Sequence, residues 1–421
     1  MKNRLRMFRH FDLVLFVAKR MRQHGGNKGN VSNKIVTIAT IAVAIGMMMI
    51  LIAIATGKGM QKEIQQKVVA FNGHLTVGHI ENEEQSISTI PLTDQVSVRQ
   101  YLDSQKEITE FHPYAAISGM LKTAEDFEGV ILKGVDSTYN WSLLNDFLVK
   151  GDFPSLKNHH SNEILISQKI ASRLQLNLQD QVDAVFISHQ LQQYPNRRKF
   201  TISGIYNSGF PEIDNHLIMG GIGHIQAINR WAENEIGGYQ ILIDDFSQAD
   251  AIAQKLYQEL PIEMTTVSLL SRYGLIFQWI SLFDFNILII LMIMIIVGVM
   301  NMSTALLALV FERTAMIGLL KALGGTNYLI QRIFLINGVL VMFRGLLVGN
   351  ALALLFYLTQ KQWSWIRLNP ETYFVSSAPV HLTLWQVLGV NTLFLVVCAL
   401  LLWFPTFMVM RIAPAKTLRV T

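Results

Sequence analysis

The amino-acid sequence predicts an α-helical membrane protein with four transmembrane helices and one large mixed α/β domain outside the cytoplasm. Of its 421 residues, 51% are hydrophobic and only 15% are charged. That composition is too apolar for a wholly soluble protein. A long polar stretch, residues 58–272, nevertheless separates the first apolar run from the second. Membrane spans and a sizeable water-exposed domain are therefore expected in one chain.

The distribution of charge indicates the topology. Residues 58–272 hold 26 Asp and Glu against 17 Lys and Arg, whereas the rest of the chain holds 4 against 18. Basic residues flank the apolar runs, as in cytoplasmic loops, so topology explains the net charge of +5 better than nucleic-acid binding does. Both termini are expected in the cytoplasm and residues 58–272 in the periplasm. The only cysteine, Cys398, lies in an apolar run, so no intramolecular disulfide is expected.

The N-terminal residues 1–34 are predicted to form a cytoplasmic amphipathic segment with nine basic residues and one acid. The first transmembrane helix is predicted over residues 35–57, because the run Ile35 to Thr56 is 22 residues long and apolar. A cleaved signal peptide is the competing interpretation, but its apolar core would be shorter and no small-residue cleavage site follows. One apolar face of a helix lying on the bilayer would comprise Phe8, Phe11, Leu15 and Ala18.

Residues 58–272 have the pattern of an α/β domain with two lobes. Helices are predicted at Ser167–Leu174 and Ser247–Leu260. A domain of this size can bury a core of its own. Short runs of β-branched and aromatic residues predict strands at 74–77, 130–132, 163–166, 200–205 and 240–243.

The C-terminal third contains the other three spans. Residues 273–311 carry one charge, Asp284, and are longer than a bilayer requires, so a stalk is expected to precede the second span. Beyond a cytoplasmic segment at 312–328, we expect the third span at 329–359, an aromatic-rich periplasmic loop at 360–384, the fourth span at 385–410 and a basic cytoplasmic tail at 411–421.

A short amphipathic helix is predicted between the second and third spans. Its apolar residues recur at i, i+3, i+4 and i+7, which is one helix face, and Gly324-Gly325 supplies a left-handed stop. Such a helix suits a groove on a soluble partner, although an ordinary turn between spans is the alternative. The apolar face comprises Met316, Leu319, Leu320 and Leu323, and the charges that keep the segment in water are Glu312, Arg313 and Lys321.

No catalytic machinery is expected. Gly57-Lys58 superficially resembles a phosphate-binding loop, but Ile52 occupies the required earlier glycine position and Gly59 replaces the hydroxyl residue. We therefore expect a non-catalytic subunit with neither a metal nor a cofactor of its own. The histidines that lack metal-ligand spacing include His159, His160, His216 and His224.

Polar and flexible residues inside the spans are candidates for a substrate cleft. Arg344 lies 12 residues past Arg332 and so near mid-membrane, where a charge requires a partner, a polar cleft or snorkelling. Gly345 and Gly349 permit close helix packing. The methionines Met47, Met48 and Met300 have flexible thioether side chains that suit variable apolar ligands. The alternative is that they pack in the helix bundle or against lipid.

The segment Glu312–Gly325, ERTAMIGLLKALGG, resembles the coupling segment of the FtsX/MacB/LolC-type ABC permeases. The order of helix, span, large domain and three spans resembles the lipoprotein-releasing LolC/LolE permeases along nearly the whole chain. One departure is Arg344, where a small or apolar residue is expected. Further similar segments are residues 16–22, 369–375, 378–383 and 413–415.

The resemblance implies a MacB-like periplasmic core, a location in the bacterial inner membrane and a permease dimer with an identical chain or a paralogue. It implies a LolD-like ATPase that binds ATP and Mg and docks on the coupling segment. It also implies a lipoprotein substrate, surrounding membrane lipids and a LolA-like periplasmic carrier. Acyl chains would enter between the first and second spans, near Met48 and Val299.

Residues 188–199 form a connection between two predicted strands that is longer than a hairpin requires. A solvated loop without a partner is one interpretation. The position also resembles the hook with which LolC-type subunits grip the carrier. The candidate hook comprises Gln193, Tyr194, Pro195, Asn196 and Arg197.

Two other functions fit the same outline. One is a MacB-like exporter subunit for peptides or drugs that works with an outer-membrane duct. The other is an FtsX-like signalling protein that activates a wall hydrolase. The length of the outer domain, residues 58–272, argues against the signalling protein, which needs a smaller outer domain.

Overall fold

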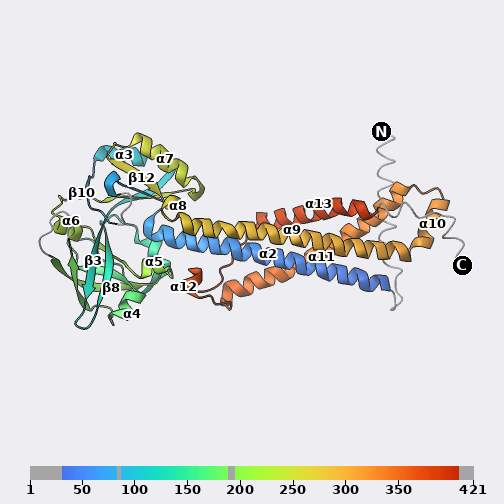
Figure 1. Cartoon of the computed structure of the whole chain (residues 1–421), viewed down its shortest axis with the longest axis horizontal. Helices are drawn as coiled ribbons and strands as arrows, with labels where there is room; N and C mark the ends of the chain where they lie inside the picture. The colour runs from blue at the N-terminus through green and yellow to red at the C-terminus, as the bar shows by residue number, and fades with distance from the viewer. Residues whose placement is uncertain (1–30, 83–86, 188–194, 407–421) are drawn as a thin grey trace. The chain divides into compact units, whose positions relative to one another are not determined.

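The computed structural model describes residues 31–82, 87–187 and 195–406. The chain divides into two compact units whose segments alternate along the sequence (Figure 1). The helical unit comprises the chain up to Met60, Ser281–Ile366 and the chain from Ala378, and the sheet unit comprises Gln61–Ile280 and Arg367–Ser377. The predicted outer loop at 360–384 therefore contributes its middle to the sheet unit.

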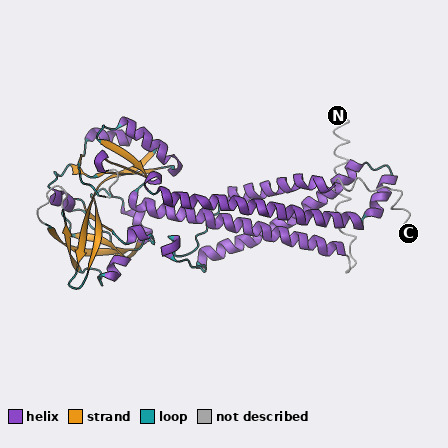
Figure 2. Cartoon of the chain, in the orientation of Figure 1, coloured by secondary structure: helices purple, strands orange, loops and turns teal. Residues whose placement is uncertain are grey.

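Long apolar helices make up the helical unit (Figure 2). In the described part of the chain, four helices are long and apolar enough to cross a membrane. Thr326 caps the start of the third, because its hydroxyl accepts a hydrogen bond from the Leu329 amide at 3.3 Å. The helices of this unit are α2 (Val31–Asn72), α9 (Gly274–Glu312), α10 (Thr314–Ala322), α11 (Asn327–Trp363) and α13 (Leu384–Thr406). Residues 61–72 of α2 and 274–280 of α9 belong to the sheet unit.

The sequence-predicted ends of the chain lie mostly outside the described residues. Of the N-terminal segment 1–34, only residues 31–34 are described, and they begin α2. The tail at 411–421 and the last residues of the fourth predicted span are likewise outside the described ranges.

A ten-stranded sheet organises the sheet unit, and six of its strands close into a ring. The ring runs β3–β4–β9–β6–β8–β7 and returns to β3, so these strands pair on both sides. The main strands are β1 (Leu75–His79), β3 (Ile108–Lys122), β4 (Phe127–Val135), β5 (Leu148–Gly151), β6 (Glu163–Ser167), β7 (Gln181–Phe186), β8 (Asn196–Tyr206), β9 (Leu217–Gly221), β11 (Gly238–Ile243) and β12 (Met264–Ser268). A separate short sheet pairs β2 (Leu92–Thr93) with β10 (Glu235–Ile236).

Strand β3 joins the two parts of the sheet unit. Its first half, Ile108–Tyr114, pairs with β11 in the open sheet β12–β1–β11–β3, and its second half pairs with β4 and β7 in the ring. Helices α3 (Val96–Ser104) and α7 (Ala249–Glu259) lie with β12 in the open part, whereas α4 (Gln168–Arg173), α5 (Pro211–Asp214) and α6 (Gly223–Asn229) lie with the ring (Figure 1). Buried apolar side chains of both parts form one continuous core.

Most of the predicted elements in this unit are present. Strands β4, β6, β8 and β11 and helix α4 confirm the predictions at 130–132, 163–166, 200–205, 240–243 and Ser167–Leu174. Strand β3 was not predicted. It contains Pro113 and Gly119, which by local rules weaken a strand. Pro113 pairs only with Tyr239 of β11, so the missing amide leaves no gap in a second ladder.

Candidate functional site

The short helix α10 between α9 and α11 is anchored on one side only. Ile317 is fully buried and packs with Val310, Ile330 and Phe334, which belong to the ends of the two long helices. Leu319 is 55% exposed and Leu323 77% exposed. Ile317 therefore anchors α10, whereas Leu319 and Leu323 are left uncovered by the chain.

The predicted apolar face of α10 is divided by the structure. Leu319 and Leu323 lie on the uncovered side, whereas Met316 and Leu320 are half-buried. The periodic pattern did not identify Ile317, because a helix of nine residues with apolar side chains all around has no single periodic stripe. Arg313 is the N-cap residue, and the flanking charges Glu312 and Lys321 both make further contacts.

The predicted glycine stop after α10 is confirmed. Gly324 has a φ of +88°, the left-handed conformation that terminates a helix. The Gly325 amide donates to the Leu320 carbonyl at 2.8 Å and the Gly324 amide to the Lys321 carbonyl at 3.0 Å. These two bonds satisfy carbonyls that the end of a helix otherwise leaves free, which fixes where α10 ends.

Close packing of α2 on α11 depends on the predicted glycine pair. A Cβ atom at Gly345 would lie 2.7 Å from Val43 Cγ1, and one at Gly349 would lie 2.6 Å from the Ala44 carbonyl oxygen. No larger residue fits either position without moving α2. The pair is thus a contact surface between two long helices, as small residues spaced by four permit.

The residues predicted to line a substrate cleft do not share one surface. Met47 is fully buried, and its Cβ lies 2.9 Å from the position that a Cβ at Gly349 would occupy, so it packs at the contact between α2 and α11. Met48 and Val299 are partly buried against the same core, whereas Met300 is 65% exposed. Arg344 is exposed on α11.

A salt bridge joins α2 to α9 where their apolar stretches end. Lys58 Nζ lies 2.7 Å from Asp284 Oδ1. The neighbouring glycines allow close contact, since a Cβ at Gly57 would lie 2.8 Å from Ile287 Cδ1 and one at Gly59 would lie 2.3 Å from the Pro379 carbonyl oxygen. The Gly-Lys-Gly sequence is therefore a helix-packing element.

A pair of asparagines links α11 to α13 and was missed in the sequence. Asn350 Nδ2 donates to Asn391 Oδ1 at 2.8 Å, and Asn391 Nδ2 donates to Asn350 Oδ1 at 2.9 Å. Each amide thus satisfies the other in an apolar environment, where an unpaired polar group is costly. The only signal in the sequence was an asparagine within each of two apolar runs, and the run of α11 contains a second one, Asn337.

The candidate hook lies partly outside the described residues, which include Pro195, Asn196 and Arg197 but not Gln193 or Tyr194. The predicted connection at 188–199 is too long. Strand β8 begins at Asn196, which pairs with Phe186 of β7, so the basic run belongs to a strand. The prediction failed because consecutive polar residues resemble a loop, although they alternate across a ladder.

Arg197 lies in a cross-strand row at the base of this hairpin. It pairs with Val185 of β7, and Val185 pairs with Met120 of β3. Directly paired residues share one face of a sheet, and both Arg197 and Met120 are exposed. The same face of the ring thus presents a cation on β8 and an exposed thioether on β3, with Val185 of β7 between them.

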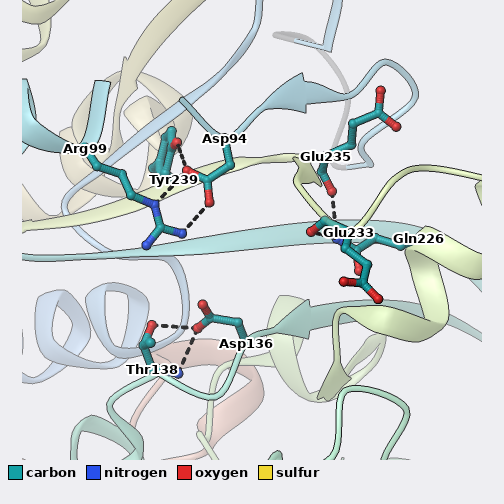
Figure 3. A network of polar contacts seen from close by, with 8 residues as sticks. All are labelled: Asp94, Arg99, Asp136, Thr138, Gln226, Glu233, Glu235 and Tyr239. Carbon is teal, nitrogen blue, oxygen red and sulfur yellow. Dashed lines mark hydrogen bonds and ion pairs between the residues drawn. The ribbon is translucent and has the colours of Figure 1, made fainter. Parts of the chain in front are cut away.

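Polar side chains elsewhere in the sheet unit satisfy one another (Figure 3). Arg99 Nε donates to Asp94 Oδ1 at 2.7 Å, and the Tyr239 hydroxyl donates to the same oxygen at 2.7 Å. Burial raises the pKa of Asp94, but these bonds and the charge of Arg99 outweigh it and leave that pKa below its usual value. Gln226 Nε2 donates to the carbonyls of Glu233 and Glu235 at 3.0 and 2.8 Å. This network ties β11 to the short sheet.

Three histidines that are scattered in the sequence lie close together. The ring centroids of His159 and His160 are 5.2 Å apart, and those of His160 and His224 are 6.2 Å apart. His159 Nε2 is 2.7 Å from Gln226 Oε1, and His224 Nε2 is 2.9 Å from the Ser161 carbonyl oxygen. In the described ranges, no group of three or more His, Cys, Asp or Glu residues could hold a metal ion.

The sequence matches two domain families. Residues 36–258 match the MacB-like periplasmic core domain, and residues 288–414 match the FtsX-like permease C-terminal domain. Together with the long apolar helices and the mixed α/β sheet unit, these matches define the class: a multi-pass membrane protein of the FtsX-like permeases with a MacB-like periplasmic core.

Curated relatives narrow this class to one family. The lipoprotein-releasing system transmembrane protein LolC of Xylella fastidiosa (strain 9a5c) is 23% identical, over 96% of this chain and 98% of its own length. LolC of Neisseria meningitidis serogroup B (strain ATCC BAA-335 / MC58) is 22% identical, over 95% and 97%. LolE of Haemophilus influenzae (strain ATCC 51907 / DSM 11121 / KW20 / Rd) is 20% identical, over 94% and 97%. The chain belongs to the LolC/LolE family of permeases.

Proposed function

We propose that this chain is the permease subunit of an ATP-driven transporter that extracts lipoproteins from the inner membrane and passes them to a periplasmic carrier. The observation that carries the proposal is the match to LolC and LolE proteins over nearly the full length of both chains. The aligned length includes the apolar helices, α10 and the sheet unit alike, so the similarity is not confined to one domain.

In this proposal α2, α9, α11 and α13 cross the membrane, and α10 lies in the cytoplasm. The basic residues that follow α9 and precede α2 support this orientation. The sheet unit is then periplasmic. Its acidic composition agrees with that location, because the positive charges of a membrane protein concentrate on the cytoplasmic side.

Helix α10 is the proposed docking element for a separate ATPase, which would bind ATP and Mg. Its support is the pair of exposed leucines, Leu319 and Leu323, on a helix that Ile317 fastens to α9 and α11. An apolar helix face in water gains stability when a groove covers it. A force applied to α10 would reach both long helices through the Ile317 cluster.

A second permease subunit, identical or paralogous, is proposed to pack against the long helices. The most apolar part of α9 is only 6% buried within the chain, and its exposed residues include Phe285, Ile296 and Met300. Acyl chains of the substrate would enter beside α9 and α2. The hook between β7 and β8 is the proposed contact for the carrier, with Arg197 attracting an acidic surface.

Co-purification tests the proposal. The full chain, expressed at native level and isolated in mild detergent, should retain an ATPase subunit, a second permease subunit and a triacylated protein. Mass spectrometry identifies each of them. Recovery with a peptide or drug pump and an outer-membrane duct, without lipid-modified protein, would contradict the proposal.

A further inference from the structure

A cavity of about 360 Å³ lies in the sheet unit where the open sheet meets the ring. Strands β1 and β12 line it from the open sheet, strands β4 and β9 line it from the ring, and β3 belongs to both. The helices α5 and α8 (Leu269–Arg272) complete the wall. All the lining residues belong to the sheet unit, so the cavity is defined within one compact part of the chain.

The floor of the cavity is one continuous face of the sheet. Thr265 of β12 pairs with Gly78 of β1, which in turn pairs with Gly238 of β11, and Gly238 pairs with Tyr114 of β3. Directly paired residues share one face of a sheet, so Thr265 and Tyr114 face the same side. In the described chain, a Cβ atom at Gly78 would approach only the Gly237 carbonyl oxygen, at 3.8 Å, within a radius of 4 Å. The missing side chain at Gly78 therefore leaves open space over the middle of this face.

Two buried hydroxyl groups of the lining have protons without an acceptor. Thr265 is 5% exposed, and its hydroxyl has no hydrogen-bond partner in residues 31–82, 87–187 and 195–406. Ser88 is 7% exposed, and its hydroxyl oxygen accepts from the Ala116 amide at 3.1 Å, whereas its proton has no acceptor in the same ranges. His79 Nδ1 accepts from the Glu81 amide at 3.2 Å, so in a neutral ring the other nitrogen carries the proton. Side chains of the lining thus offer free donors to an occupant.

Two cationic residues of the lining, Lys133 and Arg272, lie near Tyr114. Lys133 is 7% exposed, and its Nζ lies 5.2 Å from the centre of the Tyr114 ring. Burial raises the pKa of Tyr114, and the positive charge of Arg272 opposes that rise. Burial and the charge of Arg272 together lower the pKa of Lys133 to about 7, so the two cations repel each other. Within the described residues neither of them forms a salt bridge, and the one acid of the lining, Glu212, is exposed.

This lining favours an occupant that is negatively charged and accepts hydrogen bonds. A carboxylate or a phosphate dianion accepts hydrogen bonds with all its oxygens, and a guanidinium binds such a group with two parallel hydrogen bonds. Lys133 donates to the Phe71 carbonyl and to Gln240 Oε1, and its protonated form has a third N–H for the occupant. A volume of about 360 Å³ lies within the range of small-molecule sites, roughly 300–1,000 Å³.

We infer that this cavity is a binding site for a small organic anion, a molecule that carries a carboxylate or phosphate group. Arg272 and Lys133 hold the charged group, and the hydroxyls of Thr265 and Ser88 donate hydrogen bonds to it. Because strands of the open sheet and of the ring both line the cavity, the bound molecule links these two parts of the sheet unit. The inference concerns the sheet unit alone and does not depend on the proposed transport function.

Calorimetric titration of the full chain, purified in mild detergent, tests the inference. The probes are glycerol 3-phosphate and succinate, with uncharged glycerol and inorganic phosphate for comparison. At least one of the two organic anions should bind at a single saturable site, several-fold more tightly than inorganic phosphate, and glycerol should not bind. The tighter of the two identifies the charged group that the site prefers. Absence of saturable binding by both organic anions, or equal affinity for glycerol or inorganic phosphate, would overturn the inference.

Substitutions locate the binding in this cavity. Arg272 is exposed, so Arg272→Gln should leave folding intact and weaken binding about tenfold, as expected for the loss of a charge-assisted hydrogen bond. Gly78→Val places a strand-favouring side chain in the open space and should abolish binding. Gly129→Val is the matched control, because Gly129 lies on β4 outside the lining and a Cβ there meets no atom of the described chain within 4 Å. Thermal unfolding verifies that the variants are folded. Unchanged affinity in Arg272→Gln or in Gly78→Val, or an equal loss in Gly129→Val, would contradict the site.

Discussion

Lys133 Nζ donates a hydrogen bond to the Phe71 carbonyl oxygen, with 2.5 Å between the two atoms, in the last turn of α2. Its second bond goes to Gln240 Oε1 on β11. The lysine is 7% exposed, and burial together with the charge of Arg272 lowers its pKa to about 7. A neutral amine has two N–H donors, and both acceptors are present. One side chain thus fastens the end of the longest helix to the sheet.

Lys133→Met should destabilise the sheet unit by about 1–3 kcal/mol, because the Phe71 carbonyl and the Gln240 amide oxygen lose a buried donor. Hydrogen-exchange protection of β11 in the full chain, purified in detergent, measures this loss. Lys157→Met, at an exposed lysine, is the matched control and should leave protection unchanged. Equal protection in both variants would show that Lys133 does not hold α2 to the sheet.

The contribution of Lys133 to stability should also depend on pH. Its pKa is about 7 in the folded chain and near the ordinary 10.5 in the unfolded chain. Between these values the unfolded state binds more protons, so stability rises as pH increases from about 7 towards 10.5. Below pH 7 Lys133 is protonated in both the folded and the unfolded state, so the folded chain bears the full free-energy cost of burying a charged lysine. Hydrogen-exchange protection of β11, corrected for intrinsic exchange, should rise over this pH window in the wild type. In Lys133→Met the part of that rise that comes from Lys133 should be absent.

Local patterns in the sequence were sufficient for elements that are continuous apolar runs. The apolar runs of α2, α9, α11 and α13 and the short strands β6 and β11 are of this kind. Lys133 shows where such patterns fail. Nothing in its neighbourhood distinguishes a buried lysine from an exposed one, since its partners Phe71 and Gln240 are 62 and 107 residues away.

The candidate sites divide in the same way, into features that a local pattern predicts and features that depend on residues distant in the sequence. The Gly345 and Gly349 surface depends on the absence of a Cβ atom, and the Gly324 stop depends on a left-handed backbone, so the glycines themselves were enough to predict both. The burial of Met47 and Ile317 and the start of β8 at Asn196 depend on which neighbour covers each residue. That information is tertiary and absent from a local pattern.

Leu319→Glu and Leu323→Glu should each weaken ATPase binding, because a carboxylate in an apolar groove costs roughly 2–4 kcal/mol of binding free energy. Both side chains are exposed, so folding should be preserved. Binding of the ATPase in detergent and stimulated hydrolysis in proteoliposomes are the measurements. Leu319→Met, which keeps an apolar side chain of similar size, should behave as wild type. Full coupling in both glutamate variants would exclude this helix face as the docking surface.

Gly349→Leu should separate α2 from α11, because a Cβ at this position would already lie 2.6 Å from the Ala44 carbonyl oxygen. Overpacking of this kind costs about 1–3 kcal/mol, or more where backbone must move. Thermal unfolding of the full chain in detergent should shift to lower temperature. Gly389→Leu is the control, since a Cβ there meets nothing within 4 Å. An equal shift in both variants would show that the contact is not specific.

Arg197→Glu should slow association with an acidic carrier, because an exposed cation at the base of the hook steers the encounter. The effect should be largest at low salt and diminish as ionic strength rises. Replacing residues 193–197 with Gly and Ser should remove carrier binding altogether while ATPase stimulation persists. Surface plasmon resonance with the carrier immobilised measures both variants, with Lys157→Glu as the control. Undiminished carrier capture by the Gly/Ser variant would refute the hook.

Transfer of a radiolabelled triacylated lipoprotein from proteoliposomes to a soluble periplasmic carrier tests the proposed function most directly. The vesicles contain this chain, its ATPase and its second permease subunit. Transfer should require ATP hydrolysis and carrier together, and it should stop with Leu323→Glu although the lipoprotein still binds. Transfer that proceeds equally without ATP, or vesicles that stay loaded while ATP is hydrolysed in the presence of carrier, would contradict the assignment as a lipoprotein-releasing permease.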